Sequence, residues 1–178
     1  IINNIEKKND LEIELKDKNK WIFYPSITLN NKNVSIKKIN SSFKIYNANL
    51  NIKKSYWPAS PIYIILNVPS ANYEGIEIRD LTINLKYSNS IIVIENINGK
   101  IIEGNVKFLG QLNLNDAQSF DIKGEFKNIS LNTMLKQSQK TTWERVSIKL
   151  SSSNFNLSGE GKNNIHILNS LTGVVPIT

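Results

Sequence analysis

The amino-acid sequence predicts a mostly β protein: an antiparallel meander sheet, curled into an open groove or folded over as a sandwich, with one short helix. Apolar and polar residues alternate in most segments, as they do in strands that bury one face. Asn, Gly or Ser interrupts the stretch 69–135 about every eight to twelve residues, which is the spacing of successive short strands. The chain has 178 residues, enough to bury a sizeable core within one domain.

The first part of the chain predicts several strands. Alternation in segment 11–15 indicates a half-buried strand. Pro25 divides the apolar segment 21–29, and proline cannot donate a ladder hydrogen bond, so we expect an edge strand or two short strands there. Segment 42–52 alternates cleanly apart from a slip near Asn47.

We expect residues 1–178 to form a single β-rich module that is a fragment of a longer protein, because the first residue is Ile and not Met. Two prolines interrupt segment 54–61, which is the best candidate for an internal boundary. No apolar run reaches the roughly 18 residues of a membrane-spanning helix.

The middle of the chain carries the clearest strand pattern. Segment 62–68 is strongly apolar, and a Tyr-Glu-Gly turn precedes Ile76. The apolar parity then changes near Arg79-Asp80, which predicts a β-bulge. Asn98-Gly99 is a typical hairpin dipeptide, so we expect a turn there.

Segment 105–114 alternates most regularly, and segment 120–126 repeats its pattern. A short helix is expected from Leu131 to Gln137. Beyond a polar link, segments 146–150 and 154–159 predict one more hairpin, and His166 is expected on the solvent side of a strand.

A long sheet with one apolar face must cover that face. It can fold over as a sandwich, close as a barrel, or curl into a groove that another molecule fills. Composition alone favours the sandwich.

The order of strands and turns in 69–135 is more specific than its spacing. The order begins with the alternation LTINL and the segment IVIENI. It continues with the glycines Gly99 and Gly104 and the strand VKFLGQLNL, and it ends with a strand that runs directly into a short helix. This order resembles the C-terminal region of the AsmA-like proteins of Gram-negative bacteria, which are grouped with the bridge-like lipid transport proteins. The resemblance covers about a third of the chain closely and rests on strands and turns, without a catalytic signature.

The resemblance implies a curled groove and a non-catalytic role in moving phospholipid between the inner and outer membranes, and hence in envelope integrity and outer-membrane biogenesis. It also implies a periplasmic location, anchored to the inner membrane through a segment absent from this chain. The expected partners are phospholipid acyl chains and, through the full-length protein, both membranes. No cofactor or metal is required.

The candidate lipid-binding residues are apolar strand positions of shared parity. They are Leu81, Ile83, Leu85, Val106, Phe108, Leu112 and Leu114. The competing interpretation is that these side chains form an ordinary core beneath a helix or a second sheet.

The formal net charge of +7 is compatible with nucleic-acid binding. However, nearly all basic residues are Lys, with only Arg79 and Arg145 as exceptions, whereas phosphate-reading surfaces favour the bidentate fork of Arg. The abundance of Ile, Asn and Lys is typical of an A/T-rich genome. We therefore expect no specific nucleic-acid binding.

No catalytic constellation is visible in the sequence. The chain lacks Cys, and His166 is its single histidine, so neither a Cys nucleophile nor a nucleophile–base pair stands out. Carboxylates such as Glu95, Glu103, Asp121 and Glu125 fall in or beside strands, where they are usually solvated. The protein is not expected to be an enzyme.

Four aromatic residues cluster near prolines, namely Trp21, Tyr24, Tyr56 and Trp57. Their positions at turns favour core plugs or rim residues over base-stacking platforms, and at the rim of a lipid-binding groove they would meet head groups. Two other functions remain open. One is an assembly factor for outer-membrane proteins, and the other is a β-sandwich module that binds polyanions or mediates adhesion.

Overall fold

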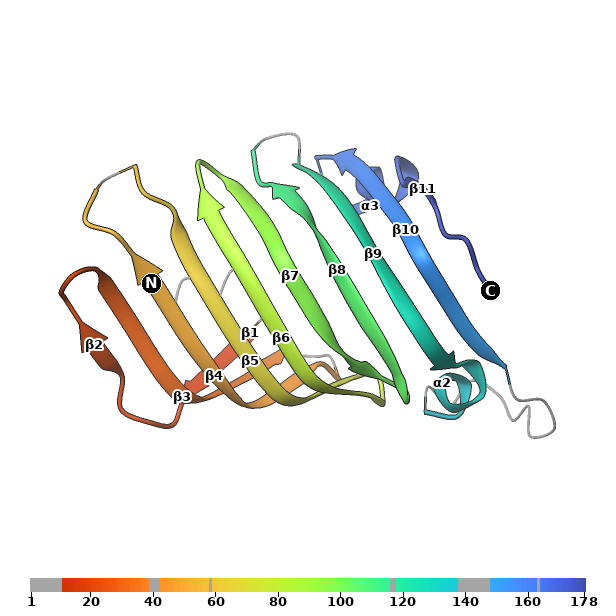
Figure 1. Cartoon of the computed structure of the whole chain (residues 1–178), viewed down its shortest axis with the longest axis horizontal. Helices are drawn as coiled ribbons and strands as arrows, with labels where there is room; N and C mark the ends of the chain where they lie inside the picture. Colours follow the sequence, from red (N-terminus) through yellow and green to blue (C-terminus); the bar gives the residue numbers. More distant parts are fainter. Residues whose placement is uncertain (1–10, 39–41, 58, 116–117, 138–147, 163) are drawn as a thin grey trace.

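A single antiparallel sheet makes up most of the protein (Figure 1). The computed structural model describes residues 11–38, 42–57, 59–115, 118–137, 148–162 and 164–178. Strands account for well over a third of the chain, which confirms the predicted fold class. The strands are β1 Leu11–Leu15, β2 Lys20–Ile22, β3 Ile27–Lys38, β4 Lys44–Lys54, β5 Ile62–Tyr73, β6 Ile76–Ser88, β7 Ile91–Ile101, β8 Gly104–Asn113, β9 Gln118–Ser130, β10 Lys149–Gly161 and β11 Thr172–Val174.

The sheet is a meander with two separate edges. Strands β3 to β11 are hydrogen-bonded in sequence order, and every pair is antiparallel. Strands β1 and β2 both pair with β3, β1 along residues 34–38 and β2 along residues 28–30. Together they form one edge of the sheet. No pairing between described residues joins this edge to β11, so the sheet is open and not a barrel.

Segment 54–61, considered above as an internal boundary, forms the end of β4 and the loop to β5. These two strands pair from Lys44↔Asn72 to Lys54↔Ile62, so the loop joins neighbours within one sheet. The division at Pro25 is confirmed, since β2 ends at Ile22 and β3 begins at Ile27, but β3 is a long strand of 12 residues and not a short one.

Three tight turns set the register of the central strands. The central residues of the turns at 74–75, 89–90 and 102–103 all have positive φ. Two positive φ values in succession are typical of type I′ turns, whose twist matches that of the flanking strands. The turn expected before Ile76 is therefore confirmed.

The hairpin expected at Asn98-Gly99 is wrong. Both residues lie inside β7, where Asn98 pairs with Lys107 and Gly99 with Val106. The glycine serves close packing and not a turn: a Cβ on Gly99 would lie 3.1 Å from the Cδ1 atom of Leu81 on β6. The chain reverses three residues later, at 102–103.

A line of backbone irregularities crosses the sheet and bends it. Asn47 and Asp80 each have φ of 51° in mid-strand, a conformation that Asn and Asp tolerate better than most residues. Pro69 lies between them on β5, where the pairing with β4 lacks two residue pairs. The slip near Asn47 and the bulge near Arg79-Asp80 are thus confirmed. Figure 1 shows the strands curving over at this end of the sheet.

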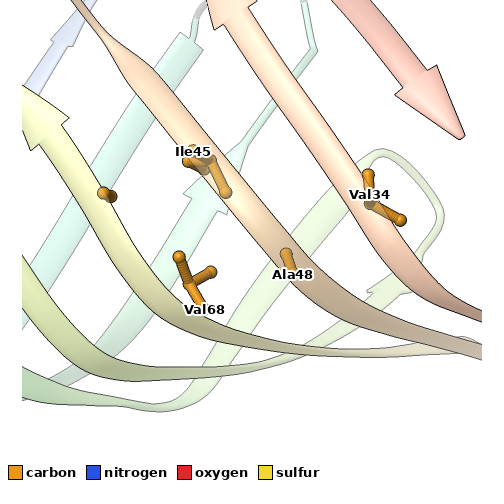
Figure 2. Packing of buried hydrophobic residues seen from close by; sticks show 5 residues of the cluster. Val34, Ile45, Ala48 and Val68 are labelled. Carbon is orange, nitrogen blue, oxygen red and sulfur yellow. The ribbon is translucent and has the colours of Figure 1, made fainter. Parts of the chain in front are cut away.

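The best-buried apolar side chains gather at this bend. Val34, Ile45, Ala48, Val68 and Ala71 form a cluster on three adjacent strands, each at most 7% exposed (Figure 2). Side chains of β1 and β6 pack around them. The alanines fit here because a bent sheet crowds the side chains on its inner face, where larger groups would be overpacked.

Two short helices are described. Helix α2 spans Leu131–Gln137, as predicted, and the Ser130 hydroxyl accepts a hydrogen bond from the Thr133 N–H as its N-cap. Helix α3, Asn164–Asn169, was not predicted. His166 is therefore exposed on a helix and not on a strand, which corrects the sequence-based expectation.

The hairpin expected from 146–150 and 154–159 is also wrong. Residues 149–161 form one continuous strand, β10, which pairs with β9 along its length, while residues 146 and 147 lie outside the described ranges. Register shifts around Ser152 interrupt the alternation there and imitate a turn in the sequence. The C-terminal tail runs beside β10, where Ser151 and Thr178 exchange two backbone hydrogen bonds.

Candidate functional site: the apolar face of the sheet

Apolar side chains form continuous rows across one face of the sheet, because residues paired directly across neighbouring strands point to the same side. The first row runs from β4 to β10 through Leu50, Leu66, Ile83, Ile97, Phe108, Gly124 and Phe155. The second is Ile52, Ile64, Leu85, Ile94, Gly110, Ile122 and Leu157. The third includes Ile62, Tyr87, Ile92, Leu112 and Phe120. We call these residues the apolar face.

The apolar face is long enough for an acyl chain. The first two rows cross seven strands, which are separated by six spacings of about 4.8 Å, so each of these rows extends for about 29 Å. One leaflet of a bilayer contributes about half of a hydrocarbon core of about 30 Å. A lipid tail lying across the strands would therefore contact apolar side chains along its whole length.

The structure places four of the seven predicted site residues on this face. Ile83 and Phe108 belong to the first row, Leu85 to the second and Leu112 to the third. Val106 pairs with Gly99, and Gly99 packs against Leu81. Val106 and Leu81 therefore border the first row on the side of the bend. Leu114 follows β8, where its N–H donates to the Ser90 carbonyl, and it is 47% exposed.

The sequence-based site omitted the strand between its two halves. Ile92, Ile94 and Ile97 of β7 lie directly between the site residues of β6 and β8. A register shift between Ile94 and Ile97 hides their common face from simple parity counting. Ile94 and Ile97 directly flank the polar pair Glu95-Asn96, and this pattern is the sequence signal that could have identified them.

No second layer covers the middle of the apolar face within the described part of the chain. Substantial contacts between elements join hydrogen-bonded neighbours, with the single addition of α3 on β10. Six of the seven predicted site residues are half-buried, shielded by their neighbours in the sheet, and Leu114 is exposed. The described residues therefore form an open curled sheet and not a sandwich.

Aromatic rings replace aliphatic side chains toward β10. The Phe155 ring lies against Gly124, where a Cβ would approach its Cζ atom to 2.8 Å, and Phe120 approaches Gly159 in the same way at 2.9 Å. Phe126 and Phe155 pack with ring centroids 6.2 Å apart. Glycine beneath a ring keeps the side-chain layer thin, so this end of the apolar face is shallower and flatter than its aliphatic middle.

The opposite face of the sheet, here called the polar face, carries exposed ion pairs together with scattered exposed apolar side chains such as Ile65 and Leu109. Lys100 Nζ lies 2.8 Å from Asp80 Oδ2, and Lys127 Nζ lies 3.2 Å from Glu125 Oε2. These groups line a shallow hollow of about 350 Å³ together with Lys107. Exposed pairs of this kind contribute little to stability, so we assign them to solubility and strand register.

The carboxyl group of Asp80 offers a pH-dependent test of this geometry. A hydrogen bond and the positive charge of Lys100 hold the pKa of Asp80 below its usual value of 3.8. A lowered folded-state pKa gives stability that is present above the unfolded value and lost as the pH falls through the folded value. In Lys100→Met, we expect the pKa of Asp80 to rise toward its usual value, as measured by NMR titration. An unchanged titration would contradict the pairing.

The acidic side chains of the described residues do not converge on a metal-binding site. Among the described residues, no group of three or more His, Cys, Asp or Glu side chains could hold a metal ion. Glu95, Asp121 and Glu125 lie on separate positions of β7 and β9, and Glu103 lies in the turn at 102–103. Within the described ranges, no helix is long and apolar enough to cross a bilayer.

Comparison of the chain with models of protein families, with curated proteins and with solved structures gave no match.

Proposed function

We propose that this chain is a non-catalytic lipid-binding module of an AsmA-like protein, which handles phospholipid acyl chains during transport between the inner and outer membranes. The observation that carries the proposal is the uncovered apolar face of the central strands. A sheet of this size normally buries such a face under helices or a second sheet. An acyl chain would supply the missing layer.

The energetics need no covalent step. Each methylene of an acyl chain moved from water to the apolar face contributes about 0.8 kcal/mol. The mainly aliphatic middle rows suit flexible chains, because they offer apolar area without a directional polar group to satisfy. The charged head group would remain at the margin of the face, where lysines and water can solvate it.

The open single sheet also separates this proposal from its main rival. A polyanion-binding or adhesion module was expected to be a sandwich with a closed core and a basic outer surface. The described residues leave the apolar face open, and the acidic residues Glu77, Asp80 and Glu125 interrupt the lysines on the polar face. Both features favour lipid. In this proposal the protein acts in the periplasm, with its inner-membrane anchor outside this chain.

A photo-crosslinking pair tests the proposal. A benzoylphenylalanine residue in place of Phe108 should capture phospholipid in cells, whereas the same residue in place of Lys107 should not. The two positions are adjacent in β8 and so point to opposite faces of the sheet. Side-chain size and expression are thereby matched, and only the face differs. Equal labelling at both positions, or labelling of protein alone at Phe108, would exclude the lipid assignment for this module.

A further inference from the structure

A cluster of exposed aromatic residues occupies one corner of the sheet. It consists of Trp21, Phe23, Tyr24, Tyr56 and Trp57, each more than half exposed, with Tyr24 at 84% and Trp57 at 79%. Large apolar side chains gathered at a surface mark a site of interaction. The exposed positions also show that these residues are not core plugs.

The topology brings two separate segments together to form this corner. Trp21, Phe23 and Tyr24 come from β2 and the turn to β3, whereas Tyr56 and Trp57 come from the loop between β4 and β5. The bases of the two loops are neighbours, because Ile27 at the start of β3 pairs with Lys54 at the end of β4. Figure 1 shows both loops at the end of the sheet away from the bend.

The corner is ordered by local contacts. The Trp21 and Phe23 rings stack with centroids 6.2 Å apart and planes inclined by 11°. The Trp57 carbonyl accepts a hydrogen bond from the Ser60 N–H at 2.9 Å and another from the Ser60 hydroxyl. The loop is thus closed by a turn with Trp57 exposed at its tip, which lowers the conformational cost of presenting the indole to a partner.

Positive charge surrounds the aromatic side chains. Lys18 precedes β2 and Lys20 is its first residue, and Lys53 and Lys54 end β4, beside the loop that carries Trp57. Asp17 is the sole acidic residue between Leu15 and Glu74. The opposite end of the sheet carries Glu74 and Glu103 in its turns, together with Lys37, Lys38 and Lys44 at the ends of β3 and β4. What sets the aromatic corner apart is therefore the combination of exposed aromatic side chains with lysines and few acidic neighbours.

We propose that this aromatic corner, together with Lys20, Lys53 and Lys54, docks the protein on the surface of an anionic phospholipid bilayer. Trp and Tyr favour the interface between head groups and acyl chains, since they combine an apolar body with a polar tip. Lysines beside them are attracted to anionic head groups and can extend to reach them while their stems stay on apolar surface. The strands would then meet the bilayer end-on.

Single-stranded nucleic acid is the other partner that aromatic residues and lysines can bind. The observations favour the bilayer. Stretch 16–73 has no Arg, and the aromatic side chains lie on two loop tips at the end of the sheet instead of along a groove that a strand of bases would follow.

Sedimentation with vesicles tests the inference on the 178-residue chain. Wild-type protein should bind vesicles of mixed phosphatidylglycerol and phosphatidylcholine, and binding should weaken as salt is raised. The double variant Phe23→Ser/Trp57→Ser should lose at least about tenfold in affinity because two interfacial anchors are removed. Lys53→Gln and Lys54→Gln should each cost about fivefold, with little effect on binding to pure phosphatidylcholine.

Tyr46→Ala is the matched control. Tyr46 is 45% exposed on β4 but lies near the bend, far along the strand from Lys54, so its removal should leave vesicle binding unchanged. Circular dichroism should show that all variants retain the wild-type fold. Vesicle binding that is absent, or that survives in the aromatic double variant, would overturn the inference. Binding of oligo(dT) that depends on the same residues, without vesicle binding, would reassign the corner to nucleic acid and overturn it equally.

This inference does not rest on the lipid-binding proposal for the apolar face. Vesicle sedimentation reports on Phe23 and Trp57, whereas crosslinking at Phe108 reports on side chains in the middle of β8. A protein that docks on vesicles but fails to crosslink lipid at Phe108 would retain the docking corner and lose the proposed function of the face.

Discussion

Replacement of Val68 by Asp should leave the protein without a stable folded state. Val68 is 1% exposed at the bend, and it belongs to the same cluster as Ala48 and Val34, which are equally inaccessible. The cluster is apolar, and the side chains of Ile13, Leu66 and Leu81 are among the apolar groups packed against it. An uncompensated buried charge costs about 3–5 kcal/mol, close to the whole stability of a marginal domain. Urea denaturation followed by circular dichroism should show loss of the cooperative transition.

Val93→Asp is the control for this prediction. Val93 lies on the polar face of β7, is 36% exposed and pairs with Lys86 across the strands. The same substitution should change the free energy of unfolding by no more than about 0.5 kcal/mol, as is usual for surface positions. If both variants unfolded at the same urea concentration, the bend would not be the stabilising core that its burial indicates.

Gly124→Ala should destabilise the sheet by about 1–3 kcal/mol, which is the usual cost of overpacking. A Cβ at this position would lie 2.3 Å from the Lys107 carbonyl oxygen and 2.6 Å from the Phe108 Cβ. The first of these atoms is backbone in the paired strand, so relief requires β8 and β9 to move apart. Thermal unfolding would measure the loss.

The matched substitution Gly99→Ala should be tolerated. Its closest contact is the terminal methyl of Leu81 at 3.1 Å, a flexible group that can move by a few tenths of an ångström. Alanine also reduces the conformational freedom of the unfolded chain, which stabilises by about 0.4–1 kcal/mol. A Gly99→Ala variant less stable than Gly124→Ala would contradict the packing described for these two glycines.

Stability and the proposed function occupy different parts of the sheet. The buried cluster lies at the bend of β3, β4 and β5, whereas the apolar face of β6 to β9 contains few fully buried side chains apart from Ile94. Substitutions at the bend should therefore act on folding. Substitutions such as Phe108→Ala should act mainly on lipid binding, since a half-buried ring on an uncovered face leaves little cavity when it is removed.

Local features of the strands could be predicted from the sequence because they depend on near neighbours. The alternation of Leu11, Ile13 and Leu15 identified β1, and the lack of an N–H at Pro25 identified the break between β2 and β3. The change of parity at Arg79-Asp80 identified the bulge, because a single extra residue is needed to return the apolar side chains to one face. The same period of two predicted that Ile83, Leu85, Phe108 and Leu112 share one face.

The misassigned elements were decided by packing between distant residues. Asn98-Gly99 has the composition of a turn, yet both residues lie within β7, where Gly99 pairs with Val106 and packs close to Leu81 of β6. The alternating segment around His166 forms helix α3, which lies directly on Gly161, where a Cβ would approach the His166 Cβ to 2.6 Å. Sequence periodicity does not reveal such contacts, because the residues in contact are far apart along the chain, and because a glycine takes part only by leaving space for its neighbour.

The amino-acid sequence thus specified that this protein has a meander of strands with one apolar face, since strand alternation is a local property that each segment carries by itself. Only the tertiary structure decided how that face is used. The bend at Asn47, Pro69 and Asp80 buries one end of it as a core, and the absence of a second layer among the described residues leaves the rest open. Coverage depends on how far the sheet curves and on what packs against it, and neither is encoded in the pattern of any single strand.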